Sequence, residues 1–203
     1  KTPWIAILLV FVSKWRTFAV RPRFWLANVK SNLVDLIFSL SIVILMFSTG
    51  IDYIFSQGLL LALYIFWLTI IKPSSKELFV QVQALFTVFF GFLALYSIAY
   101  GWNEALIFIL AFLLGYSTIR HIISSYADLN IEIFSLFWGL IVAEFAWIFN
   151  FLVIGYRINF APYFNFVIPQ AAIILTVLSF IGFNVIVSDK DKERERKEFL
   201  PEV

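Results

Sequence analysis

The chain of 203 residues contains no cysteine and only one histidine. The lack of thiols excludes disulfide bonds, thiol catalysis and cysteine-ligated metals, and a lone histidine argues against multi-histidine metal sites. Charged residues make up 14% of the chain, against about 25% in a soluble domain. The P-loop, G-x-G-x-x-G, H-E-x-x-H and G-x-S-x-G motifs are all absent from the sequence. We therefore expect no catalytic residue, metal site, cofactor or enzymatic activity.

Apolar residues are what the chain has in excess. They make up 62% of the sequence, and phenylalanine alone occurs 25 times, whereas a soluble domain is about 45–50% apolar. A soluble domain of this size could not bury so much apolar surface, because most of its residues still touch solvent. The composition thus excludes a soluble globular domain, a disordered chain and a nucleic-acid-binding module. It indicates a protein whose solvent is lipid.

Long apolar runs predict membrane-spanning helices, each of which needs about 20 residues. The runs are continuous and do not alternate, which argues against the short strands of a β-barrel. Turn-forming residues separate successive runs, as in Lys72-Pro73-Ser74-Ser75. The sequence therefore predicts an all-α, polytopic bundle of six spans, at Leu33–Ser48, Tyr53–Ile71, Leu78–Tyr100, Glu104–Ile119, Ile131–Ile154 and Tyr163–Val187.

A seventh apolar run, Pro3–Val12, is too short to span. At about 1.5 Å per residue it reaches about 15 Å, which is half of a bilayer. It is either the end of a longer span or an interfacial or re-entrant helix, and we favour the interfacial interpretation. The predicted organisation is an apolar and basic segment at 1–32, the bundle at 33–187 and a charged tail at 188–203.

The distribution of positive charge predicts the orientation. If the segment before the first span is cytoplasmic, 13 of the 15 Lys and Arg residues lie inside, and Arg157 is the one cation between spans that lies outside. The positive-inside rule favours this arrangement, with a cytoplasmic C-terminus. The inside residues are Lys14, Arg16, Arg21, Arg23, Lys30, Lys72, Lys76, Arg120, Lys190, Lys192, Arg194, Arg196 and Lys197.

Both charged ends of the chain have predicted environments. Residues 13–32 carry five cations among aromatic residues and no acid, a composition typical of a segment at the lipid headgroups. The expected headgroup contacts are Lys14, Arg16, Arg21, Arg23 and Lys30. From Asp189 to Glu198, opposite charges recur three residues apart, which predicts that the sixth span continues as a solvated helix.

Glu144 falls near the centre of the fifth predicted span, where a charged residue must face protein or water. Two interpretations stay open: a carboxyl that handles protons or cations, and a protonated glutamic acid that hydrogen-bonds to a neighbouring helix. A stripe of small residues beside it predicts a close-packed seam. The stripe consists of Ser135, Gly139, Ala143, Ala146 and Asn150.

Other polar residues in the spans complete the candidate intramembrane site. Gln83 lies in the third span with Thr87, Gly91 and Ala94, and Gln170 lies in the sixth, just after Pro169. We expect spans three, five and six to enclose Glu144, with Gln83 or Gln170 as its polar partner and Asn150 nearby. Pro169 is expected to kink the sixth helix.

The remaining titratable residues at span ends are assigned structural roles. Asp35 and Glu132 are predicted in the first turns of their helices, where a carboxylate complements the helix dipole. Asp52 and Glu104 are expected near water, and His121 is expected at the interface.

Three segments carry a resemblance: Trp67-Leu68-Thr69-Ile70-Ile71-Lys72-Pro73-Ser74-Ser75, Arg21-Pro22-Arg23-Phe24-Trp25-Leu26-Ala27-Asn28, and Arg120-His121 with Trp138-Gly139. They resemble uncharacterised multi-span membrane proteins of ultra-small, reduced-genome bacteria. The resemblance implies a bacterial cytoplasmic (inner) membrane and brings no activity or functional residue.

Three functions remain open. The preferred one is a non-enzymatic membrane subunit or scaffold of a larger assembly, whose partners are lipids, further copies of itself or other membrane subunits, and no nucleic acid. The second is a small transporter or channel that uses Glu144. The third, an intramembrane enzyme, is the least favoured because the catalytic motifs are missing.

Overall fold

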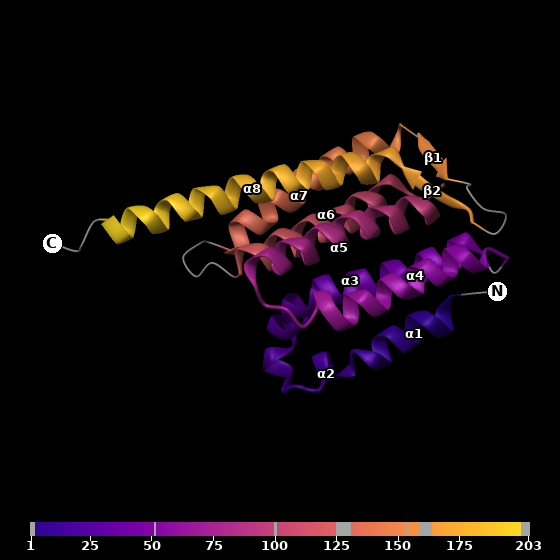
Figure 1. The fold of residues 1–203 in the computed structure, drawn as a ribbon, viewed down its shortest axis with the longest axis horizontal. Coiled ribbons are helices and arrows are strands. Elements are labelled where there is room, and N and C mark those ends of the chain that lie inside the picture. The colour runs from indigo at the N-terminus through magenta and orange to yellow at the C-terminus, as the bar shows by residue number, and fades with distance from the viewer. Residues whose placement is uncertain are drawn as a thin grey trace.

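The computed structural model describes residues 3–50, 52–99, 101–124, 131–152, 154–158 and 164–199. Helices dominate these residues, and a two-stranded hairpin interrupts them near the C-terminal end (Figure 1). The elements, in chain order, are α1 (Trp4–Ser13), α2 (Trp15–Phe18), the 3-10 turn η1 (Pro22–Phe24), α3 (Trp25–Thr49), α4 (Ile54–Phe66), the π turn η2 (Trp67–Ile71), α5 (Glu77–Ile98), α6 (Glu104–Ile123), α7 (Ile131–Asn150), β1 (Gly155–Ile158), β2 (Phe166–Pro169) and α8 (Gln170–Phe199).

The long helices run side by side along one axis and give the molecule two distinct ends (Figure 1). The end that carries α2, η1 and the α4–α5 turn is called the basic end here, because Arg21, Lys72 and Arg120 lie there. The opposite end carries the β1–β2 hairpin and is called the hairpin end. Tight turns with a glycine at positive φ, Gly50 and Gly101, end α3 and precede α6 at the hairpin end.

Five helical segments among the described residues are long and apolar enough to cross a membrane: Pro22–Thr49, Ile54–Ile71, Glu77–Ile98, Glu104–Ile123 and Ile131–Asn150. They correspond to the first five predicted spans. The prediction of a helical bundle is therefore confirmed. The apolar part of α8, Gln170–Ile186, is shorter than these five.

The first span belongs to a longer helix than the sequence predicts. Helix α3 begins at Trp25, eight residues before the apolar run, and Asp35 lies in its third turn. The prediction that Asp35 occupies a first turn and complements the helix dipole is therefore wrong. Glu132, by contrast, lies in the first turn of α7 as predicted.

The beginning of the predicted sixth span is not helical. Phe166–Pro169 forms β2, which pairs antiparallel with β1 so that Tyr156 stands opposite Ile168. Pro169 ends this strand and α8 begins at Gln170, so the predicted proline kink within a helix is wrong. The strand forms because Phe166, Val167 and Ile168 suit a pleated sheet as well as a helix. The predicted helical tail is confirmed along the backbone, since α8 continues to Phe199.

The predicted seam on the fifth span is confirmed. Four of its five residues, Ser135, Gly139, Ala143 and Ala146, are buried on the helix that packs against α6, whereas Asn150 is half-buried. A Cβ atom added to Gly139 would lie 3.0 Å from the ring of Phe112, and one added to Gly115 would lie 2.7 Å from the Cβ of Val142. Small residues on both helices thus allow close backbone contact, which makes α6 and α7 a tightly packed pair.

Helix α1 packs against α3 and is inclined only slightly to the long helices in the view of Figure 1. Its side chains are mostly exposed, as at Ile5 and Leu8, whose exposed fractions are 75% and 61%. Trp4–Ser13 is too short to count among the spanning segments, and its interfacial position stays a prediction. Neither predicted boundary coincides with a break in the fold, because α3 runs through residues 32 and 33 and α8 through 187 and 188.

Candidate functional site

Asp35 is the centre of a polar cluster between α1, α3 and the end of α4. Its carboxylate accepts hydrogen bonds from the ammonium groups of Lys14 and Lys72, the second at 2.8 Å, and from the indole nitrogen of Trp67 at 3.2 Å. Only 13% of the Asp35 side chain is exposed. The carboxylate therefore links three chain segments through charge-assisted hydrogen bonds.

The π turn η2 positions two of these donors. The amide of Lys72 donates to the carbonyl oxygen of Trp67 at 2.8 Å, so the turn closes between residues five apart and brings both side chains to the α3 side. Trp67 is fully buried and stacks on Phe38, with 3.9 Å between ring centroids. This stacking fixes the indole N–H toward Asp35. No sequence signal predicted the π turn, although such turns often accompany functional sites.

Asp35 acts differently on its two lysines. Burial lowers the pKa of Lys14, and the bond to Asp35 offsets that effect only in part. Burial also lowers the pKa of Lys72, but there the hydrogen bond and the charge of Asp35 prevail, so the net shift is upward. Asp35 therefore favours the charged form of Lys72 more strongly than that of Lys14.

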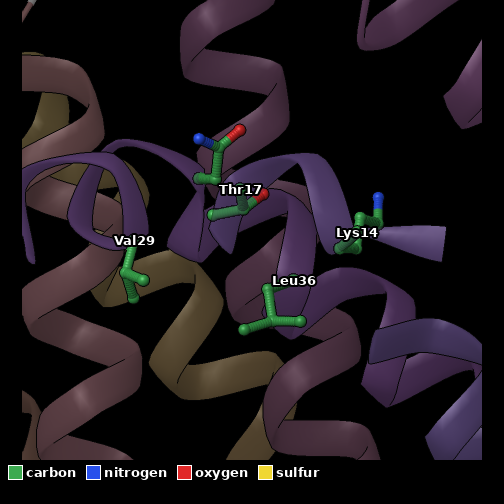
Figure 2. Close-up of a pocket in the computed structure, with 5 residues that line it drawn as sticks. Lys14, Thr17, Val29 and Leu36 are labelled. Atoms are coloured by element: carbon green, nitrogen blue, oxygen red, sulfur yellow. The ribbon is translucent and has the colours of Figure 1, made fainter. Parts of the chain in front are cut away.

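A small void lies next to this cluster and is lined by Lys14, Thr17, Val29, Asn32 and Leu36. Figure 2 shows Lys14 and Val29 on opposite sides of it, with Thr17 and Leu36 between them. Its volume is about 10 Å³, the space of about one water molecule. The void is thus too small for a substrate or cofactor.

The predicted headgroup cations divide into two groups. Lys14 is bound to Asp35, and Lys30 forms an ion pair with Glu132 at 3.0 Å. Arg21 and Arg23 are exposed on the η1 turn, and the guanidinium of Arg23 lies 4.6 Å from the ring centroid of Phe24. The side chain of Arg16 lies outside the described part of the structure. Within the part of the chain that the structure describes, neither Arg21 nor Arg23 forms an ion pair, so contact with lipid headgroups stays a prediction for these two residues.

Glu132 joins three helices at the basic end. Its carboxylate accepts hydrogen bonds from Lys30 of α3, from Arg120 of α6 at 2.9 Å and from the Tyr116 hydroxyl of α6 at 2.9 Å. Half of the Glu132 side chain is exposed, so each single ion pair contributes little to stability. The arrangement fixes the start of α7 relative to α3 and α6.

Gln83 does not meet Glu144. Its amide nitrogen donates to the carbonyl oxygens of Ile71 at 2.7 Å and Ser74 at 3.1 Å, and its amide oxygen lies 2.7 Å from Nε2 of His121. Because the amide oxygen can only accept, this geometry requires a proton on Nε2 of His121. Gln83 and His121 together clamp the α4–α5 turn to α6. His121 is half-buried in this contact.

Glu144 points out of the bundle. It is exposed on α7 and lines a shallow hollow of about 440 Å³ together with Glu104, Ala105, Phe108, Ile109 and Trp147. The indole of Trp147 donates to Glu104 at 3.1 Å. Among the described residues, no group lies within hydrogen-bonding distance of the Glu144 carboxylate. The expected hydrogen bond to a neighbouring helix, and its enclosure by spans three, five and six, are therefore not found.

Asn150 and Gln170 lie near the hairpin, apart from both Gln83 and Glu144. Asn150 lines a cavity of about 150 Å³ under β1 and β2, beside Tyr96 and Pro169. The backbone amide of Gln170 donates to the carbonyl oxygen of Ile154 at 2.8 Å, which ties the start of α8 to the hairpin. The four predicted polar residues thus occupy three separate places.

The described residues contain no group of three or more histidine, cysteine or acidic side chains that could hold a metal ion. Comparisons of the chain with known protein families, curated proteins and solved structures find no match. The function is therefore inferred from the sequence and the geometry of the polar sites.

Proposed function

We propose that the chain is a non-enzymatic membrane subunit or scaffold of a larger assembly. The main support is the position of Glu144, which is exposed on the perimeter of the bundle and has no partner among the described residues. A charged group at membrane depth costs about 2.5–3.5 kcal/mol on insertion scales, and such groups almost always face protein or water. A second molecule that covers this hollow would supply the missing environment.

The interior polar groups support the same proposal. Asp35 holds Lys14 and Lys72, and Gln83 holds His121, so these side chains connect helices to one another and do not line a shared path. Together with the close α6–α7 contact, they support a rigid helical bundle, which suits a scaffold that binds other proteins. No nucleic acid and no cofactor takes part in this role.

Gentle extraction of the full chain in a mild detergent, followed by native mass spectrometry, tests the subunit proposal. We expect a complex that contains further copies of the chain or other membrane proteins. A lone monomer across a series of increasingly mild detergents and in lipid nanodiscs would refute it.

A small transporter or channel that uses Glu144 is the second candidate, because the carboxylate stands in a hollow with room for a cation. Ion or proton flux in proteoliposomes tests it. If this function holds, Glu144→Gln abolishes the flux and leaves the helix content unchanged, whereas Asp52→Asn has no effect. Equal flux in the wild type and in Glu144→Gln would end it.

The membrane arrangement is also part of the proposal. We propose six spans with both principal charged ends in the cytoplasm, in which the 17 residues of Gln170–Ile186 form the sixth. Their length of about 26 Å is near the lower limit for a span. The charge asymmetry supports a cytoplasmic basic end, where Arg21 and Arg23 would contact anionic headgroups. The resemblance to bacterial proteins points to the inner membrane.

A further inference from the structure

The hollow at Glu144 combines charge with apolar walls on one side of the α6–α7 pair. Glu104 at the start of α6 and Glu144 on α7 are both exposed and both line it. Phe108 and Ile109 supply apolar surface, and Trp147 bonds to Glu104. The hollow therefore presents two carboxylates within an otherwise apolar face at the hairpin half of the molecule.

An apolar rim continues from the hollow. Phe151 contacts the ring of Trp147 edge-on, with 5.5 Å between centroids, and 60% of its surface is exposed. Ile148, on the same stretch of α7, is 48% exposed. A surface that combines a charged hollow with an aromatic and aliphatic rim fits another protein, because the rim supplies area and the hollow supplies specificity.

Arg157 has the complementary charge at the same end of the molecule. It lies in β1, which begins five residues after α7 ends, and the side chains of β1 are exposed. Within the described residues Arg157 has no ion-pair partner. A guanidinium can bind two carboxylates at once through its planar set of donors, which suits the pair formed by Glu104 and Glu144.

We propose that the chain forms a symmetric dimer in which Arg157 of each protomer binds Glu104 and Glu144 of its partner. Two copies inserted in the same direction hold their hairpin ends at the same level of the membrane, and a two-fold axis makes the two contacts equal. This inference rests on the proposed subunit function, and in it a second copy of the chain occupies the hollow.

Because the chain contains no cysteine, a single introduced cysteine can be labelled specifically, and dimerisation can be measured by energy transfer. A Ser75→Cys chain, labelled at the exposed basic-end turn, is divided into donor and acceptor populations, and both are reconstituted into phosphatidylcholine liposomes. Energy transfer against protein-to-lipid ratio gives the dimer dissociation constant. We expect Glu144→Gln and Arg157→Gln each to raise it at least tenfold, and Asp52→Asn, an exposed acid elsewhere at the hairpin end, to leave it unchanged.

A charge exchange separates pairing from general damage. The chain with both Glu144→Arg and Arg157→Glu regains an ion pair across the interface. We therefore expect it to dimerise more tightly than the chain with Glu144→Arg alone or with Arg157→Glu alone. Circular dichroism checks that every variant keeps its helix content.

The outcomes distinguish this inference from the subunit proposal. A dimer that persists unchanged in Glu144→Gln and Arg157→Gln overturns the proposed contact but is consistent with the subunit function. A complex that contains only other proteins has the same two consequences. A chain that is monomeric under all conditions and captures no other subunit overturns both. Failure of the charge exchange to improve on the single replacements also overturns the pairing.

Discussion

Asp35 shows how one carboxylate can organise the basic end of this bundle. It binds Lys14, Lys72 and the indole of Trp67, and so connects α1, α3 and the end of α4. The sequence contains this acid at the edge of an apolar run, but it does not show which cations reach it. The partners depend on the π turn, which adds a residue to one helical turn and rotates Lys72 toward α3.

Removal of the Asp35 charge is expected to destabilise the protein. Asp35→Asn leaves Lys14, whose side chain is 11% exposed, without its counterion. We expect a loss of about 3 kcal/mol, at the lower end of the range for broken buried pairs, because the Lys72 side chain is 42% exposed. Equilibrium unfolding in mixed micelles measures the change. Asp52→Asn is the matched control, and equal unfolding of the two variants would contradict this role of Asp35.

Glu144 contrasts with Asp35, because it has no partner among the described residues. The sequence predicted that Glu144, within a span, must face protein or water. It also predicted the small-residue seam on the same helix correctly. It could not predict that the seam turns toward α6 and leaves Glu144 outside. The rotation of a helix about its axis is fixed by its neighbour, here through the contact of Gly139 with Phe112.

Helices α6 and α7 pack closely against each other. Their contact depends on glycines whose missing side chains leave room for Phe112 and Val142. Because the obstacle at Gly115 is the Cβ of Val142, which is attached directly to the backbone, rotamer changes cannot relieve a clash there. The pair must therefore separate if Gly115 acquires a side chain.

Gly115→Ala is expected to weaken the α6–α7 contact. The added Cβ would lie 2.7 Å from the Cβ of Val142, and overpacking of this kind costs about 1–3 kcal/mol. Gly58→Ala is the control, since a Cβ at Gly58 in α4 meets nothing within 4 Å and alanine favours a helix by about 0.5–1 kcal/mol. Unfolding free energies in mixed micelles should move in opposite directions. A shift of the same sign in both variants would contradict the close contact.

The element boundaries were predicted unevenly. The apolar runs located α4 to α7 within a few residues, because a run bounded by turn residues defines both ends of a span. They missed the first turns of α3, since those turns extend beyond the apolar run into polar sequence. They also missed β2, because Phe166, Val167 and Ile168 are apolar in either conformation and their pairing depends on β1.

At the scale of the whole molecule, α8 decides on which side of the membrane the C-terminal extension would lie. Among the described residues five helical segments reach the length of a span, and α8 has an apolar part of 17 residues, Gln170–Ile186, before its charged extension. If α8 crosses, the basic end holds both the α4–α5 turn and the C-terminal extension. If it does not, the C-terminal extension remains on the side of the hairpin.

Cysteine accessibility separates these arrangements. Tyr156→Cys in β1, Ser75→Cys in the α4–α5 turn and Ser188→Cys in α8 each place one thiol at an exposed position in a cysteine-free chain. In intact cells we expect an impermeant maleimide to label Tyr156→Cys alone, and the other two only after permeabilisation. Labelling of Ser188→Cys from outside would show five spans, and outside labelling of Ser75→Cys would reverse the orientation.

The sequence by itself determined that this protein is a bundle of apolar helices, because its continuous apolar runs have the length and composition of helices that can cross a membrane. It also determined that positive charge collects at one end. Only the tertiary structure decided which polar groups meet: Asp35 with Lys14 and Lys72, Gln83 with His121, and Glu144 with no described residue. Composition fixes the environment of a helix, whereas the rotation and turn geometry that set these contacts arise from packing against its neighbours.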